Sequence, residues 1–329
     1  MTTVSISSND RTDMRDVFQA GLSALLGREV EISEPVLLAG GASKEAWSVD
    51  AGGERLIVRR AAATVMHHHT LTLKQEYAVI EAAYETGVKA PKPYGYLPDL
   101  AGREAFVMAR LEGETIGRRI VRKDELAVAR ERLPVQLAEE LAKIHSIPAA
   151  RLPFLPDASI GRMVAELDEV GEPHPAIELG LWWLRENRPP ERPAVVNHGD
   201  YRIGNVVVDE QGLAGVLDWE FAHLDDPVRD LAFGMVRAWR FGVPEKRLGG
   251  VGDAEPFVER YNELTGLDVR MAELDYWELA GNVAWAIGCL TQAQRHLSGL
   301  DRSVELATLG RLGSEVEYEI CHLLEKVTA

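Results

Sequence analysis

The 329-residue chain is 46% hydrophobic, which is typical of a globular protein and excludes an intrinsically disordered one. This length can bury a large core and predicts two lobes or domains. The formal net charge of −16 argues against a protein that wraps nucleic acid or coats an anionic membrane, so we expect neither partner.

We expect a cytoplasmic protein. The first 14 residues are polar and lack the apolar core of a signal peptide, and no apolar stretch is long enough to span a bilayer. Cys289 and Cys321 stand among apolar neighbours in helical-looking segments. They predict reduced side chains in or near the core, without a disulfide or a zinc site.

The first third of the chain predicts a small sheet with one helix. After a flexible arm over residues 1–13, we expect a helix over 14–26 that Gly27 ends. Apolar runs separated by glycine-rich turns then predict strands. The expected strands are 36–38, 45–49, 55–59, 94–97 and 105–109, and the expected helix before the fourth strand covers 71–86.

An acidic residue lies on the apolar face of this second helix. Glu76 falls three residues after Leu73 and four before Ile80, so it sits on or beside the buried stripe. Burying a carboxylate without a partner is costly, so we expect a cation beside Glu76.

The remainder of the chain is mainly helical. The predicted fold class is therefore α+β, with a small antiparallel-sheet lobe over residues 1–112 and a larger helical lobe over 113–329. The expected helices cover roughly 124–146, 158–186, 227–240, 254–265, 271–297 and 301–327.

A predicted hairpin interrupts these helices and carries three polar residues. Asn205 opens the apolar run 206–208, a turn follows, and a second apolar run ends before Asp218. If the runs pair, Asn205 and Asp218 lie roughly opposite each other and can bind one ion. Asp200 lies in the loop that enters the hairpin. One carboxylate for a hydroxyl and two oxygen ligands for Mg²⁺ are the set that phosphoryl transfer from a nucleotide requires.

Three segments follow one another in a recognisable order: 198–205 (HGDYRIGN), 218–220 (DWE) and 226–232 (DPVRDLA). With them the chain resembles the aminoglycoside phosphotransferase and choline kinase superfamily, which has the bilobal protein-kinase-like fold. It looks most like the bacterial branch related to the kinase domain of acyl-CoA-dehydrogenase fusion proteins, a similarity supported by the segments 40–43 (GGAS), 59–60 (RR) and 295–299 (RHLSG).

The resemblance implies a role for each polar residue of the hairpin. Asp200 corresponds to the catalytic residue that orients the acceptor hydroxyl or takes its proton. Asn205 and Asp218 correspond to the residues that hold Mg²⁺ against the phosphates of ATP, with GTP as an alternative nucleotide. Trp219 and Glu220 follow Asp218 where protein kinases have Phe and Gly.

The resemblance also assigns nucleotide-binding residues in the first lobe. Arg59, with Arg60 as its substitute, occupies the strand position of the usual phosphate-contacting Lys, and Glu76 becomes its ion-pair partner. The alternative is an exposed arginine and a half-exposed acid. The other implied nucleotide contacts are Gly41 and Ser43 in the loop over the phosphates, and the backbone of Ala109 and Leu111 at the adenine edge.

Other notable residues are interpreted as structural. His198 is expected to shape its loop, Asp226 to cap a helix that starts with Pro227, and Asp230 to brace the loop. The triplet 67–69 (HHH) is assigned to a solvated loop. Trp277 and Trp285 are expected in the core, and the residues expected to line an acceptor cleft are Arg237, Trp239, Arg240, Arg295 and His296.

The favoured function is an ATP- and Mg²⁺-dependent phosphotransferase that acts on a hydroxyl of a small molecule. The acceptor is an aminoglycoside or a metabolite such as a hydroxyacyl thioester. Two alternatives remain open: a metal-dependent hydrolase that uses His198, Asp200, Asp218 and His223, and a non-catalytic nucleotide-binding protein.

Overall fold

The computed structural model describes residues 8–38, 44–62, 70–300 and 302–328. Gly41, Ser43 and the triplet 67–69 lie outside these ranges, so their predicted places remain predictions.

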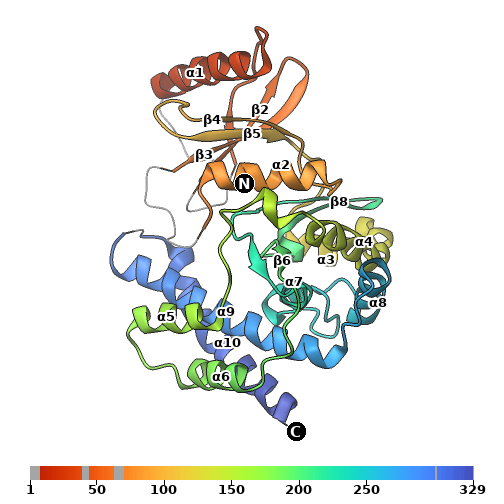
Figure 1. The fold of residues 1–329 in the computed structure, drawn as a ribbon. Coiled ribbons are helices and arrows are strands. Elements are labelled where there is room, and N and C mark those ends of the chain that lie inside the picture. The colour runs from red at the N-terminus through yellow and green to blue at the C-terminus, as the bar shows by residue number, and fades with distance from the viewer. Residues whose placement is uncertain (1–7, 39–43, 63–69, 301, 329) are drawn as a thin grey trace.

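A five-stranded antiparallel sheet forms the first lobe, with the strand order β1-β2-β3-β5-β4. The strands are β1 (Val36–Leu37), β2 (Lys44–Ala51), β3 (Glu54–Ala61), β4 (Pro93–Leu97) and β5 (Ala105–Ala109). Helix α1 (Ser8–Leu26) covers one face, and α2 (Leu73–Glu85) lies between the other face and the helical lobe (Figure 1). Alternating apolar side chains of the strands feed two separate cores on these faces.

The strands and α2 lie where the sequence predicts them, but α1 begins earlier than expected. Residues 8–13, which we assigned to a flexible arm, belong to the helix. No glycine or proline occurs in this polar stretch, so nothing in it prevents the helix from extending back from its apolar part.

The second lobe is mostly helical and holds the chain's C-terminal end (Figure 1). Its helices are α3 (Gly117–Arg122), α4 (Ala127–His145), α5 (Ile160–Val170), α6 (Pro175–Glu186), α7 (Pro227–Phe233), α8 (Ala254–Thr265), α9 (Met271–Leu297) and α10 (Val304–Thr328). The long α9 packs against α10, α7, α6 and α5, so it forms the centre of this lobe.

Two helices predicted as continuous are broken. The expected helix 158–186 divides into α5 and α6 because Gly171 adopts the left-handed conformation (φ +71°) and ends α5. The expected helix 227–240 stops at Phe233, and only a short 3-10 helix over Arg237–Arg240 follows. The expected helices 254–265 and 271–297 match α8 and α9.

The predicted hairpin is present as β7 (Val206–Asp209) paired with β8 (Gly212–Val216). A second short ribbon, β6 (Val195–Asn197) with β9 (His223–Asp225), lies beside it. The chain from β6 to β7 and the chain from β8 to β9 are therefore brought side by side.

The cysteine prediction is half right. Cys289 is buried, but Cys321 is exposed on α10 because its position falls outside the apolar stripe of that helix. Across the described residues, no helix is both long and apolar enough to cross a membrane.

Candidate active site

The loop 198–205 joins β6 to β7, and its backbone donates two hydrogen bonds to the carboxylate of Asp230 on α7. The backbone amide of His198 donates to Asp230 Oδ2 (2.5 Å) and that of Gly199 donates to Oδ1 (2.9 Å). Gly199 has φ +82°, and a Cβ there would lie 2.1 Å from the carbonyl oxygen of Phe221. Only glycine fits this turn, which explains the His-Gly-Asp sequence.

His198 has the structural role that the sequence predicts. Its Nδ1 accepts from the amide of Asp200 (3.2 Å), so Nε2 carries the proton and donates to the carbonyl of Leu217 (2.9 Å). Burial lowers the pKa of His198, although the negative charges of Asp230 and Asp200 act in the opposite direction. The neutral ring thus ties the loop to the chain that leads to Asp218.

Asp200 lies in this loop, and its carboxylate is placed between two hydrogen-bond donors. Arg202 Nε contacts Oδ1 at 2.8 Å, and Asn205 Nδ2 contacts Oδ2 at 2.5 Å. Burial raises the pKa of Asp200, although Arg202 opposes this effect. A raised pKa suits a carboxylate that receives a proton, and the two donors fix its orientation.

Asp218 follows Leu217, the residue directly after β8, whose amide donates to the carbonyl of Asn205 (2.8 Å), the residue directly before β7. As predicted, pairing of the two strands brings the backbone at Asn205 next to the chain that leads into Asp218. Asp218 has φ +67°, a left-handed conformation that is costly for most residues and tolerated by Asp and Asn. Such strain is typical of a functional position.

The donor set of these two residues fits a hard divalent cation. Asn205 turns its amide nitrogen toward Asp200, so its oxygen is available on the other side. Burial would raise the pKa of Asp218, but Arg59 outweighs it and lowers this pKa, so the carboxylate stays ionised. One carboxylate and one amide oxygen are ligands of the kind that Mg²⁺ binds.

Arg59 on β3 makes the predicted contact with Glu76 and a further one with Asp218. Its Nη1 lies 3.3 Å from Glu76 Oε1 and 2.7 Å from Asp218 Oδ1. Burial opposes the charge of Arg59, but the acids outweigh burial and raise its pKa. Arg60 is not a substitute, since its side chain points to the opposite face of the sheet and pairs with Glu45 (2.9 Å).

Lys44 on β2 is a second cation at Glu76 that sequence reasoning missed. Its Nζ lies 2.6 Å from Glu76 Oε2 and 2.7 Å from Glu220 Oε2. The first contact is also a hydrogen bond, whereas the second has the distance of an ion pair without hydrogen-bond geometry. Lys44 directly follows the segment 40–43 and precedes the expected strand 45–49, so its sequence neighbours did not indicate a buried strand residue.

The predicted adenine contacts are restricted by the sheet. The Ala109 amide donates to the Lys92 carbonyl (2.8 Å), so a nucleotide contact at Ala109 can use only its carbonyl. Leu111 follows β5 at the junction of the two lobes and is partly buried. The roles of both residues remain predictions.

A cavity of about 320 Å³ opens beside Asp200 in the helical lobe. Asp200 and Arg202 lie in its wall, and α5, α9 and the segment before β9 enclose it. Its apolar lining includes Leu71, Met163, Phe221, Phe233, Trp239 and Trp285, and α9 contributes the small residues Gly281, Ala284 and Gly288. The volume and the largely apolar wall are typical of a small-molecule site.

Only Trp239 among the five residues predicted to line an acceptor cleft belongs to this wall, and Trp285, which we expected in the core, lines it as well. Arg295 contacts Gln292, and the His296 ring accepts from the Ser303 amide (3.2 Å). Local helix geometry therefore occupies both side chains. Trp277 is in the core as predicted.

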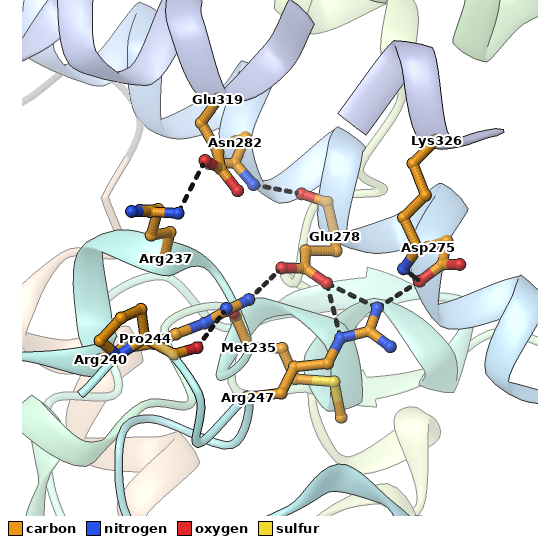
Figure 2. A network of polar contacts seen from close by, with 10 residues as sticks. All are labelled: Met235, Arg237, Arg240, Pro244, Arg247, Asp275, Glu278, Asn282, Glu319 and Lys326. Atoms are coloured by element: carbon orange, nitrogen blue, oxygen red, sulfur yellow. Dashed lines mark hydrogen bonds and ion pairs between the residues drawn. The ribbon is translucent and has the colours of Figure 1, made fainter. Parts of the chain in front are cut away.

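Arginines of the segment 237–247, which contains Trp239, bind this segment to the helices α9 and α10, as Figure 2 shows. Glu278 is buried on α9 and receives Arg240 Nη2 (2.6 Å) and Arg247 Nη2 (2.6 Å). Arg237 contacts Glu319 on α10 at 3.6 Å. These contacts turn Arg237 and Arg240 away from the cavity, while Trp239 stacks its ring under the Arg202 guanidinium at 4.3 Å.

Changing Asp230 to asparagine should destabilise the protein by about 2 to 3 kcal/mol, because one amide cannot accept from both loop N–H groups. Burial alone would raise the pKa of Asp230, but His145 and the other nearby histidines lower it. The stabilisation is therefore complete above the ordinary Asp pKa near 4 and is lost only as the pH falls through a lower value. Urea unfolding at about pH 8, where histidines are ordinarily neutral, should show the full deficit.

Asp168→Asn, on the exposed side of α5, is the matched control and should leave stability unchanged. An unchanged free energy of unfolding in Asp230→Asn at this pH would show that the two hydrogen bonds to the loop contribute little to stability.

Comparisons with known proteins agree with this arrangement. A model of the phosphotransferase enzyme family (APH) matches residues 35–266. Acyl-CoA dehydrogenase family member 11 from Pongo abelii is 25% identical over 270 residues, which are 73% of this chain and 34% of that protein. The chain thus spans about a third of the length of this relative.

Solved structures share the fold. A candidate aminoglycoside phosphotransferase from Ralstonia eutropha has a TM-score of 0.73 at 17% identity, covering 94% of this chain and 98% of that one. A spectinomycin phosphotransferase, solved with ADP and spectinomycin, has a TM-score of 0.63 at 15% identity, covering 92% and 98%. The resemblance inferred from the sequence is confirmed: the chain belongs to the phosphotransferase enzyme family and is a small-molecule kinase with the protein-kinase-like fold.

Proposed function

We propose that this protein transfers the γ-phosphoryl group of Mg²⁺-bound ATP to a hydroxyl of a small molecule held in the cavity beside Asp200. One observation carries the proposal: Asp200 lines that cavity and contacts Asn205, whose backbone lies beside the chain into Asp218, which contacts Arg59 of the sheet. The ADP complex of the spectinomycin phosphotransferase supports a nucleotide as co-substrate.

The residues divide the reaction between them. Asp200 accepts a hydrogen bond from the acceptor hydroxyl and orients its oxygen toward the nucleotide, held in place by Arg202 and Asn205. Asn205 and Asp218 would hold Mg²⁺, which would neutralise charge on the phosphate oxygens. Arg59, which lies beside Asp218, would contact the phosphates.

The cavity favours an acceptor with an apolar body over a polycation. Three of the four carboxylates in its wall have partners: Glu166 lies 2.9 Å from Arg162, Asp200 lies 2.8 Å from Arg202, and Asp230 accepts from two loop amides. Glu169 is the fourth. A polycationic aminoglycoside needs several carboxylates free to receive its ammonium groups. We therefore favour a metabolite such as a hydroxyacyl thioester.

The two other functions are less compatible with these contacts. A hydrolase with His198 as a metal ligand would require a free ring nitrogen, and both nitrogens contact the backbone. A protein that only binds nucleotide has no use for a cavity that places an acceptor at Asp200.

An ATP-consumption screen tests the proposal. The purified protein is mixed with MgATP or MgGTP and with hydroxyacyl thioesters, other neutral alcohols, choline-like amines and aminoglycosides. We expect turnover with a neutral alcohol of apolar body and none after Asp200→Asn. Turnover only with aminoglycosides would contradict the acceptor class, and no turnover with any acceptor would contradict the proposed reaction.

Filling the cavity should block the acceptor and spare the nucleotide. A Cβ on Gly288 would meet only Trp285, at 3.9 Å, so Gly288→Phe can project into the cavity without a backbone clash. We expect KM for the acceptor to rise by at least about tenfold, since burial of the acceptor is lost, with MgADP affinity unchanged.

Gly161→Phe on α5 is the matched control, because a Cβ at this exposed helix position has equally open space and does not line the cavity. An unchanged acceptor KM in Gly288→Phe would move the acceptor site elsewhere.

A further inference from the structure

Two cations from neighbouring strands share one acid on α2. Lys44 and Arg59 lie on the same face of the sheet, because Ala46 pairs with Arg59 and Lys44 is two residues from Ala46. Both contact Glu76, whose side chain is fully buried. Each cation also reaches one acid of the segment 218–220 in the other lobe.

The two contacts across the lobes differ in exposure. Arg59 holds Asp218, whose side chain is 39% exposed, and the arginine itself is 16% exposed. Lys44 holds Glu220, and the corresponding values are 13% for Glu220 and 1% for Lys44. The Arg59–Asp218 pair is thus open to a ligand, whereas Lys44 is enclosed by its two acids.

Backbone contacts make Glu220 a fixed point between the lobes. Its carbonyl accepts from the amide of Leu71 (2.8 Å), just before α2 begins. Trp219, the residue before it, is fully buried and packs against the His198 ring at 4.6 Å. Glu220 therefore connects β2 and the start of α2 to the chain that carries Asp218.

We propose that Lys44 is a positioning residue that, through Glu220, keeps Asp218 in place while Arg59 exchanges Asp218 for the nucleotide phosphates. A metal and Arg59 would share the single negative charge of Asp218, so their pair weakens when the Mg²⁺-bound nucleotide arrives. Lys44–Glu220 then remains as the charged contact between the sheet and the segment 218–220. This inference rests on the proposed function, since it requires a Mg²⁺-bound nucleotide.

A double-mutant cycle on nucleotide binding tests the inference without an acceptor. ADP affinity is titrated with and without Mg²⁺ for the full chain, Lys44→Met, Glu220→Gln and the double variant. We expect each single change to weaken MgADP binding by about tenfold, and the double change to weaken it no further than Lys44→Met, because both single changes remove the Lys44–Glu220 contact. Affinity for ADP without Mg²⁺ should stay within about twofold of the unmodified protein.

Other outcomes overturn the inference. If the losses multiply, or if Glu220→Gln binds normally while Lys44→Met does not, Lys44 acts independently of Glu220. If ADP binding falls equally with and without Mg²⁺, the role of Lys44 is only structural. Absence of MgADP binding by the unmodified protein would instead contradict the proposed function.

Two further variants serve as a matched control and as a charge-conserving substitution. Lys92→Met, at an exposed lysine that covers the Tyr94 ring, is the matched control and should bind as the unmodified protein does. Lys44→Arg keeps the charge and should restore most of the affinity. If Lys44→Met does not fold, the test rests on Glu220→Gln. Lost Mg²⁺-dependent binding of ADP at an unchanged unfolding temperature supports the inference. Normal binding of MgADP by this variant overturns it.

Discussion

Asp200→Asn is expected to lower kcat by about 10²- to 10⁴-fold, the range for loss of a positioned acid or base. Asparagine has the same shape, and its oxygen can still accept from Asn205, which lies 2.5 Å from the carboxylate, but the contact with Arg202 is lost. Asp230 still accepts from the loop amides of His198 and Gly199. The loop should therefore keep its structure, and MgADP affinity should change by no more than about twofold. Steady-state kinetics and a nucleotide titration measure the two effects.

Asp209→Asn, at the far end of the same hairpin, is the control and should be as active as the unmodified protein. Equal loss of turnover and of MgADP binding in Asp200→Asn would assign Asp200 to the nucleotide site and not to the acceptor hydroxyl. Retained turnover would show that another group orients the acceptor.

Asp218→Asn should remove most of the Mg²⁺-dependent part of ADP binding, by about tenfold or more, because a neutral amide is a weaker ligand for a hard cation. Asparagine tolerates the left-handed backbone found at residue 218, whereas alanine would add strain and confuse the result. The change also releases Arg59 from its closest acid. ADP affinity without Mg²⁺ should therefore be unchanged or higher.

Titrations of ADP over a range of Mg²⁺ concentrations measure both effects of Asp218→Asn. An unchanged Mg²⁺ dependence would count against Asp218 as a metal ligand. A fall in ADP affinity that is the same without Mg²⁺ would indicate that Asp218 supports the fold of the site and does not hold the metal.

The hairpin shows why part of the site was predictable from sequence. Asn205 and Asp218 are each adjacent to an apolar run, and strand pairing converts that spacing into proximity. Glu76 was predictable for a similar reason, since the helical period placed it on the buried face. In both cases a local rule links sequence distance to spatial distance.

The contacts of Lys44 could not be predicted from local sequence rules. Its neighbours in sequence suggest a loop, and only the pairing of β2 with β3 puts it beside Arg59 on the buried face. Its partner Glu220 is 176 residues away and reaches it because the two lobes meet there. No periodicity in the sequence encodes a contact between lobes.

The cavity wall has the same origin. Arg237 and Arg240 looked suited to an acceptor cleft, yet Glu278 and Glu319 draw them to α9 and α10, and the small residues of α9 leave the space that Trp239 and Trp285 border. The sequence by itself determined the fold class, the reaction class and the proximity of the segments that carry Asn205 and Asp218, because these depend on short spacings within the chain. The tertiary structure determined the second cation at Glu76 and the shape of the cavity beside Asp200, because both arise where segments distant in sequence pack together.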